Sequence, residues 1–196
     1  ELGILMIQDE VFTGFGRTGK LFAANYLSEK PDIMCFSKGL TGGTIPMGIT
    51  TSSNEIFESF LSDDKYKTLF HGHSFTANPL ACTAALASME LLLKEDTWTH
   101  IKLIYEKHLN FSKTLQQHPK VENVRLIGTI LAWEIKNDKQ TSYFNEIGKI
   151  SYNEFLKRGI IMRPLGNVMY LVPPYCITSE ELDLVYKNIL EVMDYL

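Results

Sequence analysis

The chain has 196 residues, of which 45% are hydrophobic and 11% aromatic, enough to bury a substantial core in one large domain or in parts of two. No apolar run reaches the roughly 18 residues of a membrane span. The first residues lack the basic flank and cleavage site of a signal peptide, so we expect no membrane partner and a cytoplasmic location. The formal net charge of -4, without a basic stripe, argues against a nucleic-acid partner. The cysteines Cys35, Cys82 and Cys176 lie far apart in apolar sequence and are expected to be buried, reduced thiols.

The chain opens on an apolar run, residues 2–8, that is closed by Asp9 and Glu10. A nearly continuous apolar run is typical of a strand covered on both faces in a parallel sheet. Ligands bind at the carboxyl ends of such strands, which places Asp9 at a candidate site, although capping of the next turn is an equally common duty for aspartate. Because no entry loop precedes the run, the sequence suggests a piece of a longer protein.

A loop rich in glycines and aromatic residues follows in residues 11–20 and is expected to bind a ligand. Gly14, Gly16 and Gly19 superficially match the dinucleotide fingerprint. No clear βαβ unit and no acidic ribose partner follow at the expected distance, so NAD is rejected. Arg17 lies either at the ligand or, as loop arginines more commonly do, in solvent.

The second candidate strand, residues 33–36, leads to Lys38 and a glycine-rich loop at residues 39–43. A lysine at the end of an apolar strand loses hydration, which disfavours its ammonium form. Such an amine can form a Schiff base with a carbonyl. The alternative is an ordinary solvated lysine beside a turn.

Residues 45–51 are expected to form a further short strand and residues 53–61 a helix. The next polar stretch contains His71, Gly72, His73, Ser74 and Thr76. Two histidines without further ligands at zinc spacing do not make a metal site, so no metal is expected. Hydroxyl groups beside the unhindered backbone of Gly72 favour a phosphate site, and the alternative is an ordinary polar loop.

A helix over residues 79–93 should begin with Asn78 as its N-cap and Pro79 as its first residue. Its small, apolar surface predicts burial between layers or domains. We therefore assign residues 1–78 to a parallel-sheet domain, residues 79–97 to a connecting helix and residues 98–196 to a smaller α+β domain.

The second half of the chain alternates helices and strands. Helices are expected over residues 98–117 and 143–157, the latter ending at Gly159, and strands within 121–135, 160–162 and 168–172. A capping box, Thr178 with Glu181, should begin a last helix. The apolar spacing predicts which side chains of the first and last of these helices face inward: Ile101, Ile104, His108, Phe111 and Leu115, and Leu182, Val185, Ile189 and Met193.

Three segments together, Ile7–Gly19, Ser37–Gly43 and His71–Leu80, resemble the class III pyridoxal-phosphate aminotransferases of fold type I in order, spacing and residue types. The resemblance implies an α/β fold, in which residues 1–78 are part of a cofactor-binding large domain with a mostly parallel sheet. A small α+β carboxyl-terminal domain completes the chain. Only the carboxyl-terminal half of a family member is covered, so the chain is a fragment or a second polypeptide supplies the amino-terminal half.

The resemblance also implies roles for residues of the large domain. Lys38 would form the covalent bond to the aldehyde of pyridoxal 5'-phosphate and then move protons as base and acid. Asp9 would pair with the pyridine nitrogen and keep it protonated. Gly72, His73 and Ser74 would contact the cofactor phosphate, Ser74 across the interface of a homodimer with shared active sites. His73 departs from the better-known pattern of the family.

Substrate contacts follow from the same resemblance. Arg163 would bind the substrate carboxylate, and Arg17 and Tyr170 would line the substrate channel. Within the family, Met162–Tyr175 is most similar to the branch of biotin synthesis. That branch implies transfer of an amino group from S-adenosylmethionine, or from lysine, to 8-amino-7-oxononanoate, giving 7,8-diaminononanoate. The alternatives are another ω-aminotransferase, acting on ornithine, 4-aminobutyrate or a similar small molecule, and an inactive fragment that serves only as a folding or dimerisation module.

Overall fold

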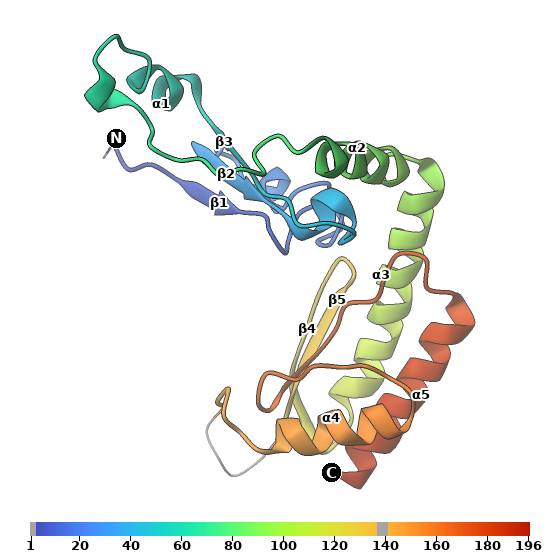
Figure 1. Ribbon diagram of the computed structural model, residues 1–196. Coiled ribbons are helices and arrows are strands. Elements are labelled where there is room, and N and C mark those ends of the chain that lie inside the picture. The colour runs from blue at the N-terminus through green and yellow to red at the C-terminus, as the bar shows by residue number, and fades with distance from the viewer. Residues whose placement is uncertain (1–2, 137–140) are drawn as a thin grey trace. The chain divides into compact units, whose positions relative to one another are not determined.

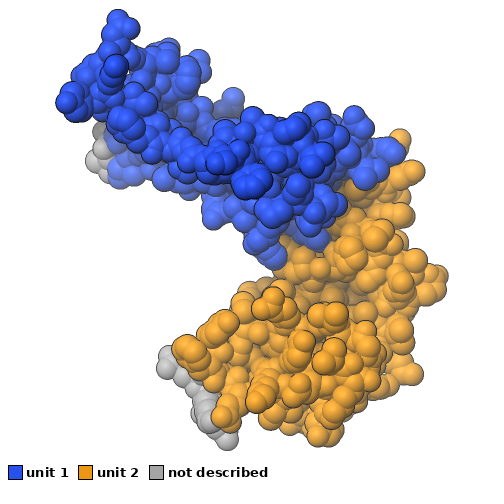
Figure 2. All heavy atoms as spheres, viewed as in Figure 1, with its two compact units in different colours: residues 1–94 blue, residues 95–196 orange. Residues whose placement is uncertain are grey.

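The computed structural model describes residues 3–136 and 141–196, which form two compact units. Unit 1 comprises residues 1–94 and unit 2 residues 95–196 (Figure 2). The division falls inside the 79–97 stretch that the sequence assigns to a connecting helix. No helix of the described ranges is both long enough and apolar enough to cross a bilayer.

Unit 1 is built on a three-stranded sheet in the order β1 (Ile7–Asp9), β2 (Ile33–Phe36), β3 (Ile49–Ser52) (Figure 1). The first pair is parallel, with Asp9 opposite Cys35, and the second pair is antiparallel. Short 3-10 helices and α-helices connect and follow the strands: η1 (Ala23–Tyr26), η2 (Lys38–Thr41), α1 (Asn54–Ser59), η3 (Lys65–Lys67) and α2 (Pro79–Leu92).

The predicted start of α2 is confirmed. The Asn78 side chain accepts hydrogen bonds from the backbone N–H groups of Leu80 and Ala81, at 2.9 and 3.2 Å, and Pro79 is the first helical residue. Capping satisfies amides that have no partner inside the helix, and proline lacks one such amide. Ser53 caps α1 in the same way through the N–H of Ile56.

Two predictions of burial in unit 1 are wrong. The first strand is shorter than expected, and Ile4, Leu5 and Ile7 are exposed rather than covered on both faces. The outer face of α2 is also exposed, with Leu80 at 72% and Leu86 at 67%. An apolar pattern shows which side chains favour burial, but within this chain too few residues are available to cover them. The cysteines are all free, but Cys35 and Cys82 are only half-buried and Cys176 is exposed.

Unit 2 packs its helices around an antiparallel sheet in the order β4 (Val121–Ile127), β5 (Ile130–Ile135), β6 (Val168–Leu171). The helices are α3 (Glu95–Gln116), which lies against β4 and β5, α4 (Ile147–Lys157) and α5 (Ser179–Tyr195) (Figure 1). The predicted inward faces are confirmed: of their nine side chains, all are buried except Val185, which is partly buried against the core. The capping box of Thr178 and Glu181 is also present.

The expected strand at residues 160–162 does not form, although the predicted helix end at Gly159 is confirmed. Gly159 has φ 73°, its N–H bonds to Leu156 O, and the N–H of Ile160 bonds to Phe155 O at 3.0 Å. This is the paired hydrogen-bond pattern of a glycine-terminated helix. The amide of Ile160 is used by this cap, and the apolar residues after it lead toward the turn at Leu165–Val168 without joining the sheet.

Candidate functional site

The candidate acid and amine follow neighbouring parallel strands. Asp9 is the last residue of β1, and Lys38 lies two residues beyond the end of β2. The N–H of Glu10 donates to the carbonyl of Cys35 at 2.8 Å, so the pairing continues one residue past β1. The carboxyl ends of parallel strands meet at one edge of a sheet, where α/β proteins bind ligands. Both candidate side chains are exposed there.

Lys38 has an unusual backbone conformation. It begins η2 with φ 43°, in the left-handed region that residues with a Cβ adopt at a cost. Its ammonium group lies 5.5 Å from the centroid of the Phe12 ring. The loss of hydration that the sequence suggests for this lysine is not present in the chain, because the side chain is exposed. The strained backbone is a different signal, typical of functional sites, which the sequence does not reveal.

Three contacts hold the segment that carries Lys38. A Cβ on Gly39 would meet Phe15 Cδ2 at 2.8 Å, so Phe15 packs directly on the backbone of that glycine. From α2, the Ser88 hydroxyl donates to the carbonyl of Gly39 at 3.1 Å. On the strand side, the Ser37 hydroxyl donates to Met47 O at 2.7 Å. Such contacts can hold a strained residue in place.

Asp9 performs the turn-capping duty that the sequence leaves open. Its Oδ1 accepts a hydrogen bond from the N–H of Val11 at 2.8 Å. This bond fixes the direction of the carboxylate as the chain enters the glycine loop. Arg17 is half-buried in that loop. The loop also reveals a residue that the sequence reasoning missed: Glu10, which is fully buried. The sequence feature that could have indicated Glu10 is its place as the second of two acidic residues directly after an apolar run.

The predicted phosphate loop is exposed over Gly72, His73 and Ser74. It is shaped by local bonds: the N–H of Thr76 donates to His73 O at 3.0 Å, and the N–H of Phe75 donates to His73 Nδ1 at 3.1 Å. The His73 ring therefore supports the turn. Within the described ranges, no group of three His, Cys, Asp or Glu side chains could hold a metal.

The two remaining predicted residues belong to unit 2. Arg163 is exposed, and Tyr170 is half-buried on β6 opposite Ala132. The nearby Asn167, which the sequence reasoning also missed, is 1% exposed. Its side chain donates to Ile135 O and to the Thr141 hydroxyl, at 3.3 and 3.2 Å. It thereby anchors the turn that follows Arg163.

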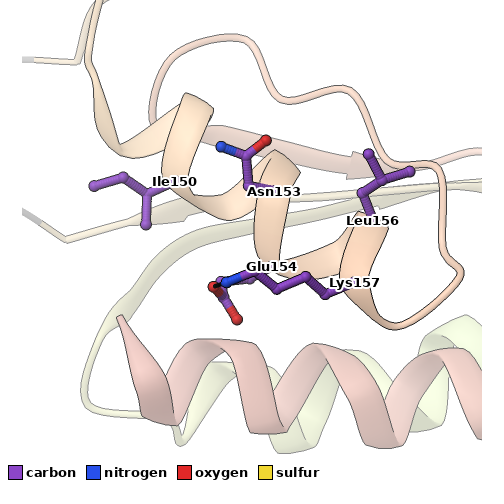
Figure 3. A pocket seen from close by; sticks show the side chains of 5 residues that line it. All are labelled: Ile150, Asn153, Glu154, Leu156 and Lys157. Carbon is purple, nitrogen blue, oxygen red and sulfur yellow. Dashed lines mark hydrogen bonds and ion pairs between the residues drawn. The ribbon is translucent and has the colours of Figure 1, made fainter.

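A shallow, open hollow of about 450 Å³ lies elsewhere, on the surface of α4 (Figure 3). Glu154 forms ion pairs there with Lys157 at 2.5 Å and with Arg158 at 2.9 Å. All the lining residues come from this one helix: Ile150, Asn153, Glu154, Leu156 and Lys157. The hollow contains none of the predicted site residues.

The family profile described as Aminotransferase class-III matches residues 1–193. The chain belongs to the class-III aminotransferase family. It is 46% identical over 192 residues to the adenosylmethionine-8-amino-7-oxononanoate aminotransferase of Synechococcus elongatus, covering 98% of this chain and 45% of that protein. The solved adenosylmethionine-8-amino-7-oxononanoate aminotransferase of Methanocaldococcus jannaschii has a TM-score of 0.89 at 36% identity, covering 98% of this chain and 46% of that one.

A solved omega transaminase from Pseudomonas jessenii, in complex with PMP, has a TM-score of 0.86 at 26% identity and covers 97% of this chain and 43% of its own. The chain thus spans less than half of the length of these class-III aminotransferases. The likeness confirms the predicted fold class: a partial fold type I large domain with a small α+β domain.

Class-III aminotransferases use pyridoxal phosphate. The chemistry of the residues present fits that group. Lys38 offers an exposed amine for its carbonyl, and Asp9 offers a carboxylate for its ring nitrogen, from the ends of adjacent parallel strands.

Proposed function

We propose that the chain is the carboxyl-terminal half of a pyridoxal-phosphate-dependent aminotransferase. The observation that carries the proposal is the pair of Asp9 and Lys38 at adjacent strand ends, with Lys38 held in a left-handed backbone. When bound, pyridoxal phosphate supplies an electrophilic carbonyl and a ring that accepts electrons. The Lys38 amine would hold pyridoxal phosphate at that carbonyl, and it would move a proton at the substrate carbon that bears the nitrogen. Asp9 accepts a hydrogen bond from the protonated ring nitrogen.

The exposed loop of Gly72, His73 and Ser74 binds the phosphate in this proposal. Its exposure in the single chain is compatible with a site shared across the two-fold axis of a homodimer, in which Ser74 serves the partner's cofactor. The exposed apolar side chains of residues 4–7 and of α2 further support a covering polypeptide, either the half of the relatives that this chain does not span or a second copy. The three free cysteines suit a reducing, cytoplasmic compartment.

For the substrates we propose 8-amino-7-oxononanoate as amino acceptor, with S-adenosylmethionine or lysine as donor. The names of the two 8-amino-7-oxononanoate aminotransferases described above support this choice. Arg163 binds the substrate carboxylate with its planar fork, and Arg17 and Tyr170 line the channel. A different ω-aminotransferase activity is the second candidate, supported by the likeness to the omega transaminase. A non-catalytic folding or dimerisation module is the third, supported by the partial length.

Reductive trapping tests the proposal. The chain, alone and together with a polypeptide that matches the remaining half of the relatives, is incubated with pyridoxal phosphate and treated with borohydride. Mass spectrometry should locate the cofactor on Lys38. Lys38→Ala should abolish the label, whereas Lys65→Ala, at an exposed lysine of η3, should retain it. A completed protein without label at Lys38 would exclude the proposed chemistry. Assays with 8-amino-7-oxononanoate against ornithine and 4-aminobutyrate then separate the candidates.

A further inference from the structure

Glu10 is a buried carboxylate to which the proposed reaction gives no role. Its side chain is 0% exposed, and its two carboxylate oxygens accept three hydrogen bonds. The Thr13 hydroxyl and the N–H of Ala23 donate to Oε2, at 2.6 and 3.0 Å, and the N–H of Ala24 donates to Oε1 at 2.7 Å. Burying an acidic group is unfavourable unless hydrogen bonds compensate for the lost water. These three hydrogen bonds therefore offset the cost of burying the Glu10 carboxylate.

The donors lie at both ends of the glycine loop. Thr13 is near its start, and Ala23 and Ala24 are the first residues of η1, where the loop ends. The backbone of Glu10 is fixed as well: its N–H donates to Cys35 O at 2.8 Å, and its carbonyl accepts from the N–H of Gly14 at 3.0 Å. Glu10 thus connects the sheet to both ends of the loop, and the loop cannot shift without breaking these bonds.

The loop closed in this way supports the lysine segment. Phe15 has φ 61° and packs on Gly39, the residue after Lys38. Its ring lies 5.7 Å from the ring of Phe22 and 6.1 Å from that of Phe36, centroid to centroid. Edge-to-face contacts at these distances are favourable and directional. If the loop moved, Phe15 would therefore no longer pack against the Lys38 segment, and Arg17, which lies in the same loop, would move as well.

We propose that Glu10 is a positioning residue, whose buried carboxylate fixes residues 11–24 so that Phe15 backs the Lys38 segment and Arg17 is presented to the substrate. The proposal deepens the function proposed above and rests on it only for what Lys38 and Arg17 do. The anchoring itself belongs to the protein without ligand and can be tested there.

Glu10→Gln is the sharpest change. Glutamine has almost the same size as glutamate, but its amide NH2 donates hydrogen bonds and cannot accept them. In this variant the NH2 group would replace one carboxylate oxygen and would lie against a donor of the loop, so at least one hydrogen bond would be lost. Hydrogen exchange in the full chain, followed by mass spectrometry, should show exchange in residues 11–26 faster by about tenfold or more, the effect of losing one hydrogen bond to a charged group. Residues 95–196 should exchange as before. The matched variant Glu29→Gln, at an exposed glutamate of the same unit, should leave both regions unchanged.

Unchanged exchange in residues 11–26 of Glu10→Gln would overturn the proposal. Should that variant fail to fold, Glu10→Asp serves for the same comparison, because it keeps the charge and shortens its reach. In Glu10→Asp, faster exchange confined to residues 11–26 supports the proposal that Glu10 fixes the loop, and exchange equal to that of the unmodified chain refutes it.

A second readout separates positioning from a merely structural role. In the protein completed with its remaining half, Glu10→Gln should raise KM for the carboxylate-bearing substrate at least about tenfold while bound pyridoxal phosphate keeps its absorbance. Loss of folded protein alone would lower the amount of active enzyme and leave KM as it was, which counts against positioning. If the unmodified protein neither binds pyridoxal phosphate nor transfers amino groups, the proposed function fails, and hydrogen exchange still decides whether Glu10 anchors the loop.

Discussion

His108 is a titratable residue enclosed in the core of unit 2. Its side chain is fully buried, and its Nδ1 lies 2.6 Å from the hydroxyl oxygen of Tyr186. Burial lowers the pKa of His108 from 6.5 to about 4, although a hydrogen bond with the Thr129 backbone acts in the opposite direction. The folded chain therefore keeps this imidazole neutral at pH values where the unfolded chain binds a proton.

Unit 2 should lose stability as the pH falls from 6.5 to 4. Over that window protons bind His108 in the unfolded state and not in the folded state, so His108 lowers the free energy of unfolding by up to about 3 kcal/mol. Hydrogen bonds from Arg125 and Lys157 lower the pKa values of Glu134 and Glu154, so these carboxylates add a further loss at the acid end of the window and below it. Urea unfolding followed by tryptophan fluorescence measures this in unit 2 alone, because Trp98 and Trp133 are the only tryptophans of the sequence and both lie there. His108→Gln, which does not titrate, should flatten the dependence. An equally steep loss in that variant would assign the acid sensitivity to other groups.

Arg163→Lys should weaken binding of carboxylate substrates in the completed enzyme. An ammonium group cannot reproduce the planar fork of a guanidinium, and a charge-assisted hydrogen bond contributes on the order of 1.5 to 3 kcal/mol. KM should therefore rise about tenfold to a hundredfold, with the absorbance of bound pyridoxal phosphate unchanged. Arg125→Lys is the matched control, since Arg125 of the same unit pairs with Glu134 at 2.7 Å and lysine can keep that pair. Equal KM values would return Arg163 to a structural role.

The sequence predicted which residues belong to the candidate site better than it predicted their burial and backbone conformation. Asp9 and Lys38 could be selected because they follow apolar runs, and the structure places them after adjacent parallel strands. The buried state of Glu10 and the left-handed backbone of Lys38 could not be selected. Glu10 depends on donors from both ends of the glycine loop, and the segment around Lys38 is held by partners as far away as Ser88. Local composition does not show which residues will supply these contacts.

Among the elements, η2 packs closely against the glycine loop, where Phe15 lies on the backbone of Gly39. Gly39→Ala should destabilise this pairing, because the new Cβ would lie 2.8 Å from Phe15 Cδ2 and overpacking costs about 1–3 kcal/mol. Trypsin cleavage after Arg17 or Lys20, measured by mass spectrometry, should become about fivefold faster or more. Gly48→Ala is the control, since its Cβ would meet only Phe36 O at an ordinary 3.6 Å. Equal cleavage in the two variants would mean that Phe15 can move aside freely.

Secondary structure could be predicted from the sequence where an element depends only on its own residues. The helices α3 and α5 bury the faces that their own spacing indicates, and the capping box of α5 joins residues three positions apart. A strand also requires a partner strand: residues 160–162 are apolar enough to form one, yet they do not pair with β4, β5 or β6. Residues 3–6 are also largely apolar, yet they lie outside β1.

The two units differ in how much core each one contains. The main buried apolar cluster lies entirely between Ile104 and Met193, whereas unit 1 buries only Phe15, Leu40, Ala81, Ala85 and Leu92 among its described apolar residues. Residues 95–196 expressed alone should therefore fold with a melting temperature within about 4 °C of the value for unit 2 in the full chain. Residues 1–94 alone should show little helical circular dichroism and rapid proteolysis. An unfolded 95–196 fragment would contradict this division.

At Lys38 the demands of the backbone and of the proposed chemistry differ. A conformation with φ 43° disfavours most residues that have a Cβ by roughly 1–2 kcal/mol, and glycine adopts it without that strain. Glycine would therefore suit the backbone at this position better than lysine does. Only lysine, however, supplies the amine that the proposed function uses, so here the reactive group is expected to cost the fold some stability.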